Sequence, residues 1–542
     1  MKTRRAGTRS RQQVRNGVIA TAALGGLLLT CTTIPIAASA AESAAPSPVA
    51  SDAPWTKTVS YLVDQLTASE KISLLRGGAP VGGPTGTNEL DPDPHGQAGY
   101  IKGVPRLGIP ENRHVDALGV NVSADTTASP SRIGLASSFS RELLGQFGQL
   151  TGEEGLGTGM TLIYGPQADL ARTPSWSRNN TAYSEDAYLA SQLMSDEITG
   201  IQGTGLMSQV KHVGMYNGQA QATPSIVEGQ AAHEIYLAPA EQAAKDGVSS
   251  MMCSYATFQI KDDPRYSKPD YACENSVLMQ DIIKNDWNFK GFITSDYNAL
   301  HSTSDLLAGV NQEFATSYFT AANLQPLIDP TSADYSAAYQ AAADDSIART
   351  LYQDERFGLL DNQHIPAAYQ SDVPQHGDVD VYDNTVTINK KKGIAEAEEL
   401  AERSAVLLKN DNSALPLSKD STVNVVGTTS NLLPAAPGGE RSQGFGDRAT
   451  ISPIKGLQAI GGSKVSSNPG VDALGTTVPA ANLKQDVDGT AAGLTRTETP
   501  AGGGAAVTTT SALLDGSRPT SFAATPTSGP ASSMCPPMTP TS

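Results

Sequence analysis

Residues able to act as nucleophiles, acids, bases or cations follow four apolar runs of the sequence. An ionised carboxylate can attack the anomeric carbon of a sugar as positive charge develops there. A nearby arginine or lysine keeps such a carboxylate ionised, and with imidazole these groups offer the donors and acceptors that sugar hydroxyls require. The pattern therefore predicts a carbohydrate site built from Asp116, Arg178, Lys211, His212 and Asp296.

Each of these residues has a structural interpretation when it is taken alone. A single Asp after an apolar strand is more often the N-cap of a helix. Lys211 would ordinarily be a surface charge beside a hydrogen-bonded core histidine, and an Arg pair would form structural ion pairs. The functional interpretation rests on the group, to which Tyr255 adds an apolar surface and a hydroxyl.

Alternating strands and helices are expected to position these residues. Between about 53 and 365 an apolar run precedes each polar segment, and a helical pattern, Glu185–Gln202, lies between two of them. This alternation indicates a parallel α/β sheet, and the length favours a (β/α)8 TIM-like barrel. In such a barrel the chemistry lies just after the carboxyl ends of the strands. The expected strands are Gly159–Tyr164, Leu206–Val210, Val248–Cys253 and Phe289–Thr294.

Beyond this region the composition changes twice. Residues 366–392 form a polar, Asp-rich linker. Residues 393–475 contain a helical pattern, Ala395–Lys409, and a strand, Val423–Val426, which together predict part of a second domain, an α/β sandwich. Residues 476–542 are dominated by Thr, Ala, Ser, Gly and Pro, so a low-complexity tail is expected.

The N-terminus has the pattern of an export signal. Residues 1–15 are basic, Gly17–Leu29 is apolar and Ala38–Ala40 offers small residues for cleavage. Residues 1–40 are therefore predicted to be a signal peptide, followed by a flexible lead-in over 41–52. The apolar run is shorter than the roughly 20 residues that span a bilayer as a helix. We expect a secreted protein with no membrane association after signal removal.

Composition and cysteine content narrow the classes of partner. The 542 residues include 38 Lys and Arg against 55 Asp and Glu, a net charge of −17, which disfavours binding to nucleic acid. Four cysteines are too few for a disulfide scaffold, and none forms a CxxC pair. Cys253 and Cys273 could form a disulfide in an oxidising compartment or remain buried thiols, and the sequence leaves both alternatives open.

Five ordered motifs resemble glycoside hydrolase family 3, the group of the β-glucosidases. The resemblance extends over about residues 60–470. The matching segments are residues 171–186 (family pattern ARDPRWGRNFEYFSED), Lys211–His212 (KHF), residues 252–255 (MCSYN), residues 271–275 (YACEN) and Ser295–Tyr297 (SDW).

This resemblance implies a reaction and a role for each site residue. Asp296 would be the nucleophile and Tyr255 would pack beside it. Hydrolysis would retain the anomeric configuration through a covalent glycosyl-enzyme. The implied partner is a carbohydrate substrate, and neither a metal ion nor an organic cofactor is implied. The residues assigned to the hydroxyls of the sugar in the −1 subsite are Asp116, Arg178, Lys211 and His212.

The sequence departs from the family pattern at positions that bear on the choice of sugar. The family's RNFE reads Arg178–Thr181 here, so the carboxylate beside the sugar-binding Arg is missing. Val122 stands where many members have an Arg, and NNQE reads Tyr216–Gln219. The PGHG-type loop of the branch that cleaves N-acetylglucosaminides does not follow Lys211–His212.

The family's acid/base Glu lies in the second domain, after a turn whose counterpart here is Pro437–Ser442. The sandwich pattern ends near 475, and residues 485–525 resemble the opening of a PA14-like module, so we expect a truncated or frame-shifted chain. Retaining hydrolysis needs two carboxylates about 5–5.5 Å apart. Glu440 is the nearest candidate for the second, with a solvated loop carboxylate as its structural alternative.

Three functions are compatible with these patterns. The leading one is a secreted retaining glycoside hydrolase that releases sugar residues from β-glucosides or related oligosaccharides, with its acid/base either Glu440 or missing. The second is a catalytically impaired sugar-binding remnant, and the third is a β-xylosidase on the same fold. The sequence does not distinguish glucose from xylose and predicts neither the linkage nor the oligomeric state.

Overall fold

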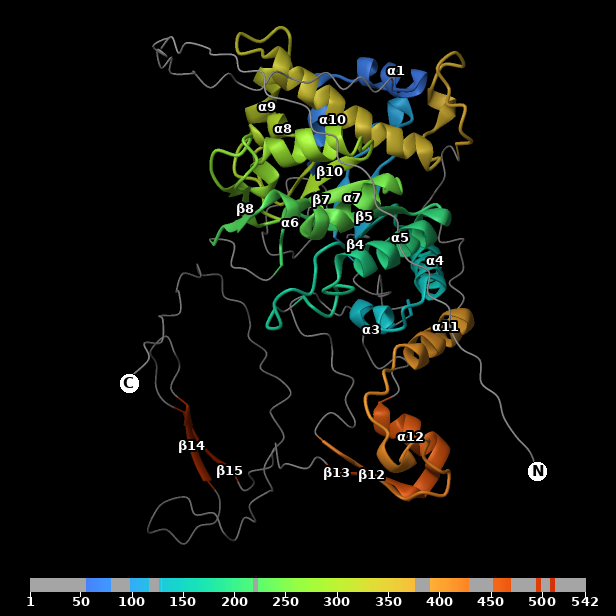
Figure 1. Ribbon diagram of the computed structural model, residues 1–542. Coiled ribbons are helices and arrows are strands. Elements are labelled where there is room, and N and C mark those ends of the chain that lie inside the picture. The colour runs from blue at the N-terminus through green and yellow to red at the C-terminus, as the bar shows by residue number, and fades with distance from the viewer. Residues whose placement is uncertain are drawn as a thin grey trace, which may run out of the picture. The chain divides into compact units, whose positions relative to one another are not determined.

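In the computed structural model a six-stranded sheet lies among the helices of residues 55–375 (Figure 1). Every neighbouring pair in it is parallel except the last. Every residue of its five parallel strands is buried, as in a sheet that is covered on both faces. The strands are, in hydrogen-bonded order, β10 (Phe292–Ser295), β7 (Ser250–Cys253), β5 (Met207–Val213), β4 (Leu162–Gln167), β3 (Asn112–Val115) and β2 (Gly99–Ile101).

The structure describes ten stretches of the chain. They are residues 55–78, 98–116, 126–127, 129–176, 178–217, 223–375, 390–427, 452–468, 494–498 and 507–511. The predicted signal peptide and lead-in lie outside them, as does most of the predicted tail.

A short strand pair links the two edges of the sheet. β1 (Arg76–Gly77) and β11 (Glu313–Phe314) pair in parallel, and the single bridges Gly78–Tyr100 and Thr294–Gln312 connect them to β2 and β10. Backbone pairing therefore runs around a ring. The expectation of eight parallel strands was wrong at β2, which is antiparallel to β3. A short connection, which includes a turn of 3-10 helix at Pro105–Leu107, joins these two strands, and only a parallel pair needs a long crossover.

Helices flank the sheet, and several have side-chain caps (Figure 1). Ser140 accepts from the N–H of Leu143 and Asp186 from that of Leu189, which fixes where two long helices begin. The helices are α1 (Lys57–Gln65), α2 (Ala68–Leu75), α3 (Arg132–Ala136), α4 (Arg141–Gly157), α5 (Ala187–Gly203), α6 (Gly229–Ala231), α7 (Ala238–Lys245), α8 (Asp305–Ala308), α9 (Ala321–Ile328), α10 (Ala337–Arg356), α11 (Lys390–Arg403) and α12 (Pro453–Gly461), with π-helical turns at Ala232–Tyr236 and Val277–Asp286.

Helices α4 and α5 pack closely because glycines line their contact. A Cβ at Gly148 would lie 2.3 Å from the carbonyl oxygen of Glu197, and one at Gly200 would lie 2.3 Å from that of Gly145. The close contact holds α5 against α4, and the loop that precedes α5 contains Arg178.

The predicted strands and the first predicted helix agree with the structure to within a few residues. The expected strand at Leu206–Val210 is β5, which runs three residues further, and the expected helix at Glu185–Gln202 is α5. The helix expected at Ala395–Lys409 is α11, but it ends at Arg403. Beyond it Leu407 and Leu408 are 64% and 91% exposed, so the apolar pattern there does not mark a buried helix face.

The C-terminal described elements form two small sheets. β12 (Val423–Val426), which was predicted, pairs in parallel with β13 (Val465–Asn468), and α12 directly precedes β13. β14 (Leu494–Glu498) and β15 (Val507–Ser511) form an antiparallel pair inside the predicted tail. The linker, the partial sandwich, the PA14-like module and the domain boundaries stay predictions. Within the described stretches, no helix combines the length and hydrophobicity needed to cross a bilayer.

Candidate active site

The carboxylate of Asp296 directly follows β10 and is almost buried, with 7% of the residue exposed. Its Oδ1 accepts hydrogen bonds from the Tyr255 hydroxyl at 2.7 Å and from the backbone N–H of Tyr297 at 2.6 Å. Its Oδ2 has no hydrogen-bond partner among the described residues and lies 3.3 Å from His212 Nε2. Two donors therefore fix one oxygen and leave the other with capacity for a ligand.

Opposing effects act on the pKa of Asp296, and the result lies below the ordinary value for Asp. Burial by itself raises this pKa. The proximity and charge of His212, the hydroxyl of Tyr255 and the charge of Lys211 together lower it by more. Asp296 is thus ionised at neutral pH, the state in which a carboxylate can act as a nucleophile.

His212 is held by the carboxylate of Asp169, which was not among the predicted site residues. Asp169 Oδ2 lies 2.7 Å from His212 Nδ1 and accepts from the His212 backbone N–H at 3.2 Å. Burial lowers the pKa of His212, but Asp169 and then Asp296 raise it by more, so the pKa ends above its ordinary value. Asp169 stands two residues after β4, and this position at a strand end is the signal that could have identified it.

A second ion pair joins Lys211 to Asp116. Lys211 lies on β5 and is 3% exposed, and its Nζ donates to Asp116 Oδ1 at 2.6 Å. Asp116 directly follows β3 and its side chain is 40% exposed. The buried ammonium is therefore paired, as burial of a charge requires, and the carboxylate extends to the exposed side of the pair.

Tyr216 joins the remaining predicted residues through an aromatic cluster. Its ring lies edge-on to those of Trp176, His212 and Tyr255, with centroids 5.6, 5.2 and 5.9 Å away. The guanidinium carbon of Arg178 lies 5.7 Å from the centroid of the Tyr216 ring, within cation–π range. Tyr216 had been noted only as a departure from the family pattern, and its contacts could not be predicted because its partners come from separate loops.

A buried ion pair anchors the end of the loop that carries Arg178 and Trp176. Arg132 Nη2 donates to Glu197 Oε1 at 2.6 Å, and the Tyr183 hydroxyl donates to Glu197 Oε2. Both charged side chains are at most 1% exposed. The loop that precedes α5 is thereby tied to α3 and α5 by side chains distant from the site.

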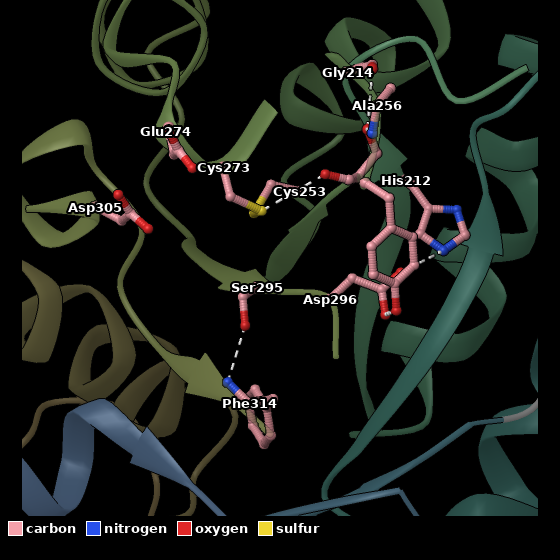
Figure 2. Close-up of a disulfide and its surroundings, with 12 residues drawn as sticks. His212, Gly214, Cys253, Ala256, Cys273, Glu274, Ser295, Asp296, Asp305 and Phe314 are labelled. Carbon is pink, nitrogen blue, oxygen red and sulfur yellow. Dashed lines mark hydrogen bonds and ion pairs between the residues drawn. A yellow bond between two sulfur atoms is a disulfide. The ribbon is translucent and has the colours of Figure 1, made fainter. Parts of the chain in front are cut away.

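Packed side chains fill the ring of strands beneath the site. His114 Nδ1 lies 2.9 Å from the Tyr164 hydroxyl, and both rings contact Phe314. Burial lowers the pKa of His114 to about 3, so this histidine is neutral. The backbone N–H of Phe314 donates to Ser295 Oγ at 2.9 Å, which links this interior to the residue before Asp296 (Figure 2).

The six predicted site residues form one network, although their roles stay predictions. His212, Tyr255 and Asp296 are in direct contact, Lys211 pairs with Asp116, and the charge of Arg178 acts on the Tyr255 hydroxyl. Val122, Gly218, Gln219 and the segment Pro437–Ser442 with Glu440 lie outside the described residues.

The cysteines form the disulfide that was one of the two open alternatives. Cys253 and Cys273 are joined by an S–S bond of 1.98 Å, with Cα atoms 5.3 Å apart (Figure 2).

Comparisons with known proteins found similarity to one family. Residues 99–318 match the family model described as the glycosyl hydrolase family 3 N terminal domain. The chain is 30% identical over 430 residues to a probable β-glucosidase L of Aspergillus terreus, which covers 75% of this chain and 54% of that protein. It is 29% identical over 387 residues to the thermostable β-glucosidase B of Acetivibrio thermocellus, over 68% of this chain and 44% of that one.

Among solved structures, the β-glucosidase DesR of Streptomyces venezuelae, in complex with D-glucose, aligns with a TM-score of 0.61 and 27% identity. The alignment covers 79% of this chain and 52% of DesR. The chain spans about half the length of the curated relatives described above. The family model, these relatives and the shared fold agree: residues 99–318 match the N terminal domain of glycosyl hydrolase family 3, and the chain is similar to β-glucosidases.

Proposed function

We propose that the chain is a secreted, retaining glycoside hydrolase that acts on β-glucosides, with Asp296 as the nucleophile. The observation that carries the proposal is the state of this carboxylate. It is buried and its pKa is lowered, Oδ1 is held by two donors, and Oδ2 has no hydrogen-bond partner among the described residues. Oδ2 is then the atom that attacks the anomeric carbon.

The reaction proceeds in two displacements at the anomeric carbon. In the first, a bond forms from Asp296 Oδ2 to this carbon as the bond to the leaving-group oxygen breaks, and that oxygen takes a proton from a general acid. In the second, water attacks the same carbon, loses a proton to the conjugate base of that acid and releases the carboxylate. Two inversions give a product with the configuration of the substrate.

The remaining side chains of the network bind the sugar. Asp116 accepts from hydroxyls while Lys211, already paired with it, donates to them. Arg178 donates from beside the Tyr216 ring, and His212 donates from the position where its Nε2 faces Asp296 Oδ2. Tyr255 keeps its proton because burial and the neighbouring Asp296 raise its pKa, so it continues to donate to the nucleophile.

A second candidate, a sugar-binding protein with impaired catalysis, is favoured by the pairing of the other carboxylates. Asp116 pairs with Lys211 and Asp169 with His212, so both carboxylates are already engaged by a cationic partner and not by a leaving group. Glu440, the candidate acid from the sequence, lies outside the described stretches. An aryl glucoside with a good leaving group needs little acid assistance, so a barrel without its acid would react with it and fail on cellobiose.

Secretion is supported by the basic and apolar pattern of residues 1–40. The disulfide Cys253–Cys273 also fits an oxidising compartment, where such bonds persist. Mass spectrometry of the exported protein would test this: a mature N-terminus near Ala41 supports the proposal, and retention of the full leader inside the cell contradicts it.

The nucleophile is tested with an activated 2-deoxy-2-fluoro-β-glucoside, which slows release of the covalent intermediate more than its formation. Intact-mass analysis should show one bound fluoroglucosyl group, and peptide mapping should place it on Asp296. Asp296→Ala should abolish labelling and reduce aryl glucoside turnover by about 10⁴-fold or more, the order expected for loss of a nucleophile. Asp116→Ala is the matched control and should mainly raise KM. A label on another carboxylate would overturn the assignment.

A further inference from the structure

The disulfide joins the end of one active-site strand to a short segment of separate chain. Cys253 is the last residue of β7, and Cys273 lies in a single turn of 3-10 helix, Ala272–Glu274. Both cysteines are completely buried. Tyr255, the donor to Asp296 Oδ1, lies only two residues beyond Cys253. Figure 2 shows Cys253 between the Cys273 segment and the residues around Asp296.

Hydrogen bonds fix the backbone on either side of Tyr255. Before it, the Ser254 N–H donates to the carbonyl of Val213 at 2.9 Å, and Ser254 Oγ donates to the carbonyl of Gly214 at 3.0 Å. After it, the Ala256 N–H donates to Ser254 Oγ at 3.1 Å. The carbonyl of Ala256 accepts from the N–H of Ala272, the neighbour of Cys273, at 2.8 Å.

The same segment packs directly on the chain that follows His212. Gly214 has a φ of +113°, and a Cβ there would lie 2.6 Å from the Cβ of Ala272. Ala272 therefore occupies the space that a side chain at position 214 would need. The loop that carries Tyr255 and the chain that directly follows His212 on β5 therefore share this support, and both side chains contact Asp296.

Beyond its contacts with Gly214 and Ala256, the Cys273 segment is held by the burial of Ala272 and Cys273 and by the ion pair of Glu274 with His301. Its preceding strand, β9 (Asp270–Tyr271), is two residues long and pairs only with β8 (Thr257–Ile260), the strand that follows Tyr255. The disulfide connects this segment to the central sheet across 20 residues of sequence, and it limits the conformations available to the loop between them.

We propose that the Cys253–Cys273 disulfide is a positioning element for the nucleophile: it keeps the Tyr255 hydroxyl on Asp296 Oδ1, and catalysis depends on it through that hydrogen bond. The inference rests on the proposed function of Asp296. It assigns the disulfide a role in the rate of glycosylation as well as in stability. Because both sulfurs are buried, the bond is best removed by substitution rather than with a reductant.

The test is a cycle of variants of the full chain, with the rate of labelling by the activated fluoroglucoside as its readout. Cys253→Ala with Cys273→Ala should slow labelling about 10-fold, within the range that a hydrogen bond to a charged group contributes. Tyr255→Phe should slow it by a similar factor. Combining all three changes should add little to Tyr255→Phe alone, because the disulfide acts through that hydroxyl.

The pH profile separates positioning from stability. The Tyr255 hydrogen bond lowers the pKa of Asp296, so its loss raises that pKa and moves the acid limb of the labelling rate to higher pH. The disulfide variant and Tyr255→Phe should both show this shift. Leu351→Ala, which removes a buried side chain from α10, is the matched control: it should lower the unfolding temperature and leave the profile unchanged.

Other outcomes distinguish the two proposals. If the wild-type chain is not labelled, the proposed function fails, and hydrogen exchange of residues 254–256 then decides the positioning role. Exchange there should accelerate in the disulfide variant and not in Leu351→Ala. Unchanged exchange, an unshifted acid limb or fully additive effects would each overturn the inference. If the double variant does not fold, Cys273→Ala alone, which retains the Cys253 thiol in the core, takes its place.

Discussion

The pKa values of the side chains in this site are set by the charges of neighbouring side chains. Asp296 owes its lowered pKa first to His212, and His212 owes its raised pKa first to Asp169. Asp169 therefore affects the pKa of Asp296 through His212, although no described contact joins the two carboxylates.

Asp169→Asn should weaken this chain without removing any predicted substrate contact. Loss of the Asp169 charge lowers the pKa of His212, so less imidazolium faces Asp296 and the pKa of Asp296 rises. The acid limb of kcat/KM should therefore move to higher pH, by about one unit if one charge-assisted hydrogen bond is lost. pH–rate profiles on an aryl glucoside check this against the remote control Asp344→Asn, which should leave the limb in place.

At the scale of residues, the sequence identified candidates where the chemistry was concentrated in motifs, and their roles stay predictions. Asp116, Arg178, Lys211, His212, Tyr255 and Asp296 were all predicted from sequence, and the structure places them in one network. Asp169 and Tyr216 were not predicted as site residues because their significance comes from partners on other strands and loops. A lone carboxylate after a strand or a lone Tyr in a loop has no such partner in the sequence.

At the scale of elements, the length of a strand decided whether it could be predicted from the sequence. Long apolar strands were predictable because several consecutive buried residues produce a clear pattern. β1, β2 and β11, with two or three residues each, were not, since so few residues show no period. The antiparallel pairing of β2 with β3 likewise depends on tertiary contacts and cannot be predicted from local sequence.

Glu197→Ala should destabilise the fold and loosen the loop that carries Arg178. It leaves the fully buried Arg132 without its carboxylate and removes the acceptor of the Tyr183 hydroxyl. Breaking a buried pair costs about 3–5 kcal/mol. The expected result in denaturant unfolding is a loss of that order, together with a raised KM.

Asp196, the residue before Glu197, provides the control for the Glu197→Ala experiment. Asp196, also on α5, pairs at the surface with Arg141 at the start of α4, and the Arg141 side chain is 61% exposed. Asp196→Ala should cost less than about 1 kcal/mol and leave KM unchanged. Equal losses from both substitutions would contradict the anchoring role of Glu197.

For the molecule as a whole, a buried carboxyl on α10 should make stability depend on pH. Asp354 Oδ1 accepts from Asn112 Nδ2 at 3.0 Å, and its Oδ2 has no hydrogen-bond partner among the described residues. Burial raises the pKa of Asp354 to about 7, from an ordinary value of 3.8. Between about pH 4 and 7 the folded state binds the extra proton, so the free energy of unfolding falls as pH rises through that window.

Asp354→Asn should remove most of this dependence. The variant should match the wild type near pH 4 and exceed its stability at pH 8 by up to about 4 kcal/mol, the value of a three-unit shift. Denaturant unfolding at pH 4, 6 and 8 checks this, with the exposed Asp334→Asn as control. A variant less stable than the wild type at pH 8 would rule out the buried charge as the cause.

The closure of the strand ring has a consequence for the time course of folding. β10, which leads to Asp296, is bridged to the β11 segment at Thr294–Gln312, and β11 in turn pairs with β1. The Phe314 ring of β11 occupies the space of a Cβ at Gly77 of β1, which would lie 2.1 Å from it. These partners come from opposite ends of the barrel sequence, and contacts of such long range form slowly. Helical signal should therefore recover early during refolding, while the ability to form a glycosyl-enzyme returns only when the first strand of the ring has docked.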